Sequence, residues 1–159
     1  MLRSASITLL LIVSVAAQSL AAATDTPAAT YSPASKHRQL VDMPEQARDL
    51  IRDDMLDHLS ALNEIIGLLG ENKLEAAAAV AESRMGKSSM GKHRGTGMGM
   101  GMGPGRFMTP EMRSLGHGMH AAATEFAEVA KKGDVKNAYA ALQNITSGCV
   151  ACHYSFRIR

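Results

Sequence analysis

Apolar side chains recur at intervals of three and four residues in two long stretches of this 159-residue chain. The first stretch contains Ile51, Met55, Leu59, Leu62, Ile66 and Leu69. The second contains Val135, Ala138, Leu142, Ile145, Cys149, Cys152 and Phe156. This spacing predicts two helices that each bury one apolar stripe against other helices. Both cysteines of the chain are expected on the second buried stripe.

Capping and helix-breaking residues divide the chain into four predicted helices. The first begins near Asp42-Met43-Pro44-Glu45 and ends at Gly70, and the second runs from about Asn72 to Gly86. The third begins at Thr109-Pro110-Glu111 and ends at Gly133, and the fourth is capped by Asp134. Small polar capping residues, prolines in the first turn and glycines after the last turn indicate where these helices begin and end. The pattern therefore predicts an all-α fold.

Residues 86–105 interrupt this helical pattern. The stretch GKSSMGKHRGTGMGMGMGPG is rich in glycine and methionine and has neither a helical nor a strand period. Such biased composition is typical of a loop without a packed core. We therefore expect a mobile loop between the second and third helices.

The first 23 residues have the features of a secretory signal peptide. A positive start at Arg3 is followed by an apolar run over residues 7–17 and by small residues at 21–23. The run is shorter than the roughly 20 residues a membrane-spanning helix needs. We expect an exported mature protein with no membrane span, a flexible lead-in at residues 24–41 and one domain at residues 42–159.

Composition limits the partners and the fold class. The formal net charge is +2 for the whole chain and +1 without Arg3, so no strong field attracts nucleic acid. Aromatic residues make up 4% of the chain and tryptophan is absent. A chain with few aromatic residues and many alanines and leucines favours helices over strands.

The sequence Cys149-Val-Ala-Cys152-His153 is the motif with the most specific chemistry. A Cys-x-x-Cys-His can attach haem, form a thiol–disulfide redox pair, provide half of a zinc site or arise by chance. A redox pair expects a βαβ context, and zinc needs a second pair of ligands at suitable spacing. We therefore interpret the motif as a covalent attachment site for one c-type haem, with His153 as the proximal iron ligand.

These residues also carry a resemblance to a known family. An exported helical chain with Cys149, Cys152 and His153 on its last helix, followed by Phe156 and Arg157, resembles the cytochrome c′ family, the class II c-type cytochromes. The resemblance implies an antiparallel four-helix bundle in the periplasm, with haem attached to the C-terminal helix. Low-spin members of the family use a methionine of the first helix as the sixth iron ligand.

The first half of the first helix is expected to lie opposite the haem, because neighbouring helices of an up-and-down bundle are antiparallel. Met55 is the predicted distal ligand, although a methionine on an apolar stripe is more often a packing residue. His58 is a weaker candidate that we expect to be partly exposed. Arg48, Arg52 and Arg157 could pair with the haem propionates, but ion pairs within the first helix explain Arg48 and Arg52 equally well.

Two functions are compatible with such a haem protein. We favour an electron carrier that serves an unidentified periplasmic redox partner. The alternative is a five-coordinate protein that binds or sequesters NO or CO. No nucleophile, base and orienting group occur together as an enzyme would require, and the sequence is compatible with a homodimer.

The loop and the third helix offer a second chemistry. Between Met85 and His120 the chain has eight methionines and three histidines, and thioether and imidazole groups favour Cu(I). No tight cluster with fixed ligand spacing is present. We therefore favour low-complexity drift and helix packing over a copper site in this Met-rich loop.

Overall fold

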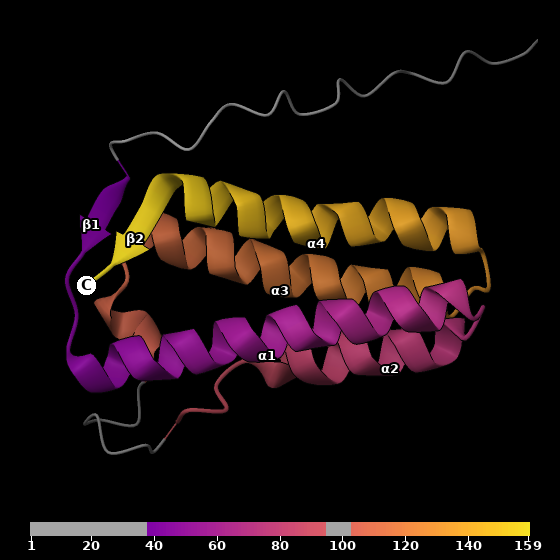
Figure 1. Cartoon of the computed structure of the whole chain (residues 1–159), viewed down its shortest axis with the longest axis horizontal. Helices are drawn as coiled ribbons and strands as arrows, with labels where there is room; N and C mark the ends of the chain where they lie inside the picture. Colours follow the sequence, from indigo (N-terminus) through magenta and orange to yellow (C-terminus); the bar gives the residue numbers. More distant parts are fainter. Residues whose placement is uncertain (1–37, 95–102) are drawn as a thin grey trace, which may run out of the picture. The chain divides into compact units, whose positions relative to one another are not determined.

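The computed structural model describes residues 38–94 and 103–159 (Figure 1). In this part of the chain the elements are, in order, β1 Gln39–Val41, α1 Glu45–Gly70, α2 Leu74–Met85, η1 Lys87–Ser89, η2 Pro104–Phe107, α3 Pro110–Ala130, α4 Val135–Ser155 and β2 Phe156–Ile158. The predicted signal peptide lies outside the described residues. The fold is mostly helical, as predicted, and is consistent with a helical bundle.

Local sequence signals account for the ends of the helices. The side chain of Thr109 accepts a hydrogen bond from the backbone nitrogen of Met112 at 3.1 Å and caps α3. Asp134 caps α4 in the same way, accepting from the backbone nitrogen of Asn137 at 3.0 Å. Each cap satisfies a donor that the first helical turn leaves unpaired. The predicted starts of both helices are confirmed.

The helices pack in sequence order, α1 on α2, α2 on α3 and α3 on α4, and lie side by side in Figure 1. The main core cluster is rich in alanine, and its largest fully buried side chains are Ile65, Met85, Phe126 and Ile145. Alanine at a helix contact lets two backbones approach closely, and the larger side chains fill the space that remains. A core of this kind needs few aromatic residues, and Phe126 is the one aromatic side chain among its largest buried members.

The buried face of α1 differs from the predicted stripe. Met55, Leu59 and Ile66 are exposed. The residues that are buried instead are Ala47, Ile51, His58, Ala61, Ile65 and Leu69. The prediction favoured the largest apolar side chains, whereas close packing of α1 against α2 selects small ones. The predicted stripe is therefore correct at Ile51, Leu69 and the partly buried Leu62, and wrong at Met55, Leu59 and Ile66.

A two-stranded parallel sheet was not predicted. Gln39 pairs with Phe156 and Val41 pairs with Ile158, so residues placed in the lead-in by the sequence form β1. Phe156 belongs to β2 and has an extended backbone, which corrects the prediction that it continues the helical stripe. The pairing holds the segment before α1 beside the end of α4.

A second core cluster lies at this sheet. Its buried members are Val41, Met43, Ala47, Ile51, Met112 and Phe156. They come from β1, α1, α3 and β2 and from the segment between β1 and α1, so the start of α1 and the end of α4 share one apolar environment. The cysteine motif at the end of α4 therefore lies beside this cluster.

The predicted loop at residues 86–105 is partly ordered at its two ends. Short 3₁₀ helices, η1 and η2, begin and close the segment, while residues 95–102 lie outside the described structure. Among the described helices, none combines the length and the hydrophobicity that crossing a membrane requires.

Candidate functional site

The cysteine motif occupies the last turns of α4. Cys149 and Cys152 lie three residues apart, so one turn separates them on the same side of the helix. Both are half-buried, and His153 beside them is exposed. A Cβ atom at Gly148 would lie 3.2 Å from the Cβ atom of Met119. The glycine therefore lets α4 approach α3 closely just before the motif.

The two cysteines join the two apolar clusters. Cys149 packs against the main core, and Cys152 packs against the cluster that contains Met43 and Met112. Burial raises the pKa of both thiols, with the neighbouring Cys149 adding to the effect at Cys152. A thiol–disulfide exchange site instead lowers the pKa of its attacking cysteine. Their surroundings therefore favour covalent attachment of a cofactor over redox exchange.

A zinc site also lacks its ligands. Within residues 38–94 and 103–159, no three His, Cys, Asp or Glu side chains come together where they could hold a metal ion. A structural zinc ion usually has four such ligands. Haem is the interpretation of the motif that the described residues continue to support.

The three arginines predicted near the haem propionates have different surroundings. Arg48 is half-buried, and its Nε atom is fully buried with no hydrogen-bond partner in the described structure. Arg52 is exposed and pairs with Asp49 at 3.2 Å. Arg157 is exposed, and its Nε donates to the backbone oxygen of Arg38 at 3.4 Å. Arg48 is therefore the arginine whose buried Nε–H has no acceptor among the described residues.

The two residues predicted for the distal side of the haem differ from expectation in their solvent exposure. Met55 is 39% exposed and belongs to neither core cluster, whereas His58, expected to be partly exposed, is only 7% exposed. The methionines that share a cluster with Cys152 are Met43 and Met112. Met43 stands next to Pro44 and Met112 lies in the first turn of α3, and neither position belongs to a predicted stripe. No periodic signal in the sequence distinguishes Met43 or Met112.

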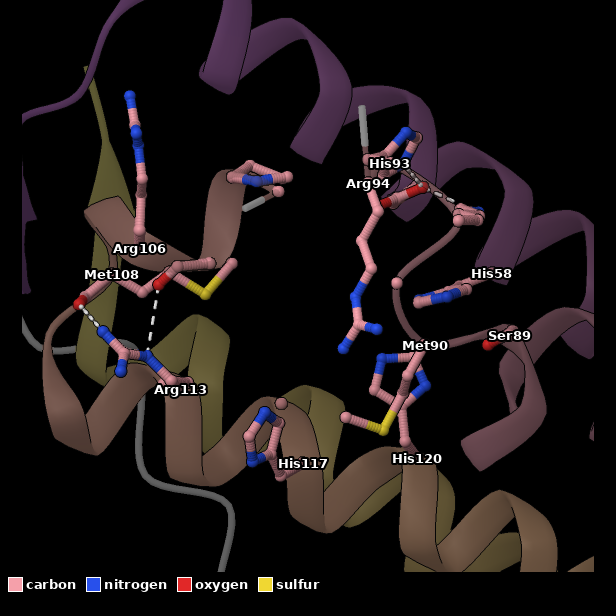
Figure 2. Close-up of a pocket in the computed structure, with 17 residues that line it drawn as sticks. His58, Ser89, Met90, His93, Arg94, Arg106, Met108, Arg113, His117 and His120 are labelled. Carbon is pink, nitrogen blue, oxygen red and sulfur yellow. Dashed lines mark hydrogen bonds and ion pairs between the residues drawn. The ribbon is translucent and has the colours of Figure 1, made fainter. Parts of the chain in front are cut away.

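A cavity of about 520 Å³ that was not predicted from the sequence is lined by residues of α1, η2, α3 and the segment after α2 (Figure 2). Four histidines line it, one from α1, one from the segment after η1 and two from α3: His58, His93, His117 and His120. They are far apart in the sequence, so spacing alone could not reveal the group. The copper hypothesis rested on the methionines and histidines between Met85 and His120; its central Met-Gly repeat at residues 95–102 lies outside the described structure, and the described part of the chain does not support it.

Hydrogen bonds hold several groups of this cavity. Asp54 accepts from Lys92 at 2.7 Å and lies 2.8 Å from Nε2 of His93. His120 uses its Nδ1 atom to contact the backbone oxygen of Met85 at 2.7 Å. Burial lowers the pKa of His58, and the neighbouring His120 lowers it further. His58 is therefore neutral at pH 7.

The end of α4 fits the haem that the motif implies. Two thiols stand one turn apart beside apolar clusters, an imidazole follows them, and the orphaned Nε of Arg48 lies on α1 between Ala47 and Ile51, both members of the Cys152 cluster. Thiols and imidazole are the groups that hold a c-type haem. A buried guanidinium donor suits a propionate carboxylate.

Comparison with known proteins agrees with this chemistry. Residues 108–157 match the family model described as Cytochrome C'. The matched stretch contains α3, α4 and the complete Cys-x-x-Cys-His motif. No curated protein and no solved structure showed a match to the chain.

Proposed function

We propose, from the assignment to the cytochrome c′ family that this match supports, that the protein is an exported electron carrier with one covalently bound haem c. The family match indicates a c-type haem protein. Electron transfer, the periplasmic location after removal of residues 1–23 and a redox partner there are parts of the proposal. Bound haem would supply an iron centre that alternates between the ferric and ferrous states.

The motif at the end of α4 assigns the attachment chemistry. Cys149 and Cys152 form the two thioether bonds, and His153 provides the proximal nitrogen ligand. The high pKa of both thiols keeps them protonated until attachment takes place. The proposed bundle is antiparallel, in accordance with the β1–β2 pairing that holds the start of α1 near the end of α4.

The exposure of His153 is the observation that carries the proposal of electron transfer. Its side chain is exposed, while Cys149 and Cys152 are half-buried. A haem held by these residues would lie where the exposed His153 adjoins the apolar clusters around the two cysteines. A redox partner can approach the exposed His153, and the apolar cluster around Cys152 limits access of water to the haem.

Gas binding is the second candidate, and one observation favours it. The buried residues of α1 in the Cys152 cluster are Ala47 and Ile51, which have no atom able to ligate iron. If neither Met43 nor Met112 reaches the iron, the sixth position is surrounded by apolar groups. A small neutral ligand such as CO or NO could then occupy it.

Covalent attachment of haem is tested first, on protein that is expressed together with a haem maturation system. Acidified acetone should leave the haem with the wild-type polypeptide, whereas a Cys149→Ser, Cys152→Ser double variant should carry no bound haem. Extraction of the colour from the wild type would show that the attachment proposal is wrong.

Spectroscopy and potentiometry then separate the two functions. A low-spin ferric spectrum, fast reversible reduction and slow CO binding support electron transfer. A high-spin spectrum with immediate CO binding to the ferrous protein supports gas binding instead and overturns the proposal of an electron carrier.

A further inference from the structure

The described residues that line the cavity of Figure 2 carry an excess of positive charge. The carboxylate of Asp54 is the acidic group among them, and the four cationic side chains are those of Lys92, Arg94, Arg106 and Arg113. The Nζ atom of Lys92 lies 2.7 Å from the carboxylate of Asp54, so these two charges offset each other. The arginine charges remain, and they repel a cation and attract an anion.

Arg113 of α3 is held in place without losing its charge. Its Nε and Nη2 atoms donate to the backbone oxygens of Gly105 and Met108, each at 3.2 Å. Both acceptors are neutral, and a guanidinium has five N–H groups, so donors remain for a ligand. A guanidinium that is already positioned can bind an oxyanion at a low cost in conformational entropy.

Arg94 brings a second guanidinium from the segment after η1. Figure 2 shows its side chain extending into the cavity. Among the described residues, no acidic group pairs with it. Because Arg94 is exposed, water hydrates its guanidinium in the free protein. An anionic ligand would replace that water with charge-assisted hydrogen bonds, which are stronger than those between neutral groups.

The size of the cavity and its uncharged walls favour an organic anion over a bare ion. Its volume of about 520 Å³ is typical of a site for a small organic molecule. Met90, Pro104 and Met108 provide apolar wall. Nδ1 of His120 donates to the backbone oxygen of Met85 at 2.7 Å, which leaves its Nε2 able to accept a hydrogen bond from a hydroxyl group.

A doubly charged group gains most from this lining, because its attraction to each arginine grows in proportion to its own charge. Guanidinium groups also match phosphate oxygens through paired hydrogen bonds. We propose that the cavity binds a small phosphorylated molecule, with Arg94 and Arg113 on its phosphate group. Neither cysteine belongs to the described lining, so this site is distinct from the attachment motif on α4.

The proposal is tested on the haem-loaded protein by calorimetric titration with glycerol 3-phosphate, in a phosphate-free buffer of low ionic strength. The wild type should bind one equivalent. Arg94→Gln and Arg113→Gln should each weaken binding at least about tenfold, since each removes a charge-assisted hydrogen bond. Arg159→Gln is the matched control, because it removes the same charge at an exposed position outside the lining, and it should leave the affinity unchanged.

Further probes separate the ligand classes. Inorganic phosphate should bind more weakly than the ester, because it lacks the organic part, and succinate should bind more weakly because it lacks a phosphate group. Arg94 is exposed, so Arg94→Gln keeps the test valid even if loss of the Arg113 hydrogen bonds disturbs the fold. The proposal is overturned if glycerol 3-phosphate does not bind, if Arg94→Gln binds it as tightly as the wild type, or if inorganic phosphate or succinate binds as tightly as the ester.

Discussion

The ring of His58 on α1 contacts the ring of His120 on α3 almost at a right angle, at a centroid distance of 5.7 Å. The two residues are 62 positions apart in the sequence, from 58 to 120. Their contact gives the core of this protein a polar group that titrates. It also joins α1 to α3 at the cavity.

Because His58 is buried at this contact, we expect the free energy of unfolding to decrease as the pH falls. The pKa of folded His58 lies below its ordinary value of 6.5, because burial and His120 disfavour the charged ring. A group with a lowered folded pKa stabilises the fold fully above its unfolded pKa and loses that contribution as pH falls. Urea unfolding should therefore show a declining free energy of unfolding below about pH 6.5.

The slope of that decline identifies the histidine responsible. His58→Gln should flatten the dependence between about pH 5 and 7, whereas His117→Gln, at an exposed site, should leave it unchanged. Equal slopes in wild type and His58→Gln would show that His58 does not control this transition.

Met55→Leu is expected to leave the haem spectrum unchanged. Met55 is 39% exposed and lies outside both core clusters, so no described packing contact fixes its sulfur. The free energy of unfolding should change by less than about 1.5 kcal/mol, as for other swaps of similar volume. Absorption spectra of the ferric and ferrous protein check this, and a change from low spin to high spin in the variant would restore Met55 as the iron ligand.

Arg48 is expected to influence the reduction potential more than Arg52 does. The buried Nε of Arg48 has no partner among the described residues, while Arg52 pairs with Asp49 on the surface. If Arg48 pairs with a haem propionate, loss of its positive charge should disfavour the reduced state, by about 1–2 kcal/mol for charges about 10 Å apart at an effective dielectric constant of about 20. Potentiometric titration should show a lower potential for Arg48→Gln, little change for Arg48→Lys and little change for Arg52→Gln. Equal shifts in the two glutamine variants would contradict the role given to Arg48.

Arg84 is expected to stabilise the packing of α2 on α1. Its guanidinium donates to the side chain and backbone of Asp57 and, at 3.0 Å, to Glu64. The hydrogen bond from Arg84 holds the pKa of Asp57 below its ordinary value. Because the groups are partly exposed, Arg84→Gln should lower the free energy of unfolding by only about 1 kcal/mol. Lys73→Gln, which removes the more exposed ion pair with Glu71, should have a smaller effect in the same denaturation assay.

Much of the helical framework could be predicted because helix ends depend on neighbouring residues. Thr109 and Asp134 cap their helices through hydrogen bonds that span three positions. α1 ends at the predicted Gly70, and the left-handed residue that follows it is Asn72, with a φ of 58°. The Cys-x-x-Cys-His motif likewise has its chemistry within five consecutive residues, and its match to a cytochrome family agrees with that interpretation.

The buried face of α1 depended on distant contacts instead. Periodicity identified an apolar stripe through Met55, but the folded bundle, with α1 packed on α2, buries the face that contains His58 and Ala61. The fit between helices depends on side-chain size and backbone separation, which one helix alone does not specify. The role of Met55 as a distal iron ligand does not depend on this buried face and stays a prediction.

The sequence by itself determined the α-helical class, the helix limits and the attachment motif, since each depends on interactions within a few residues. Tertiary structure alone decided that Gln39–Val41 pairs with Phe156–Ile158 and that His58 meets His120. It also separated the orphaned Arg48 from the surface pair of Arg52. These features join segments far apart in the chain, and their energies arise only when packing removes water and sets the distances between groups.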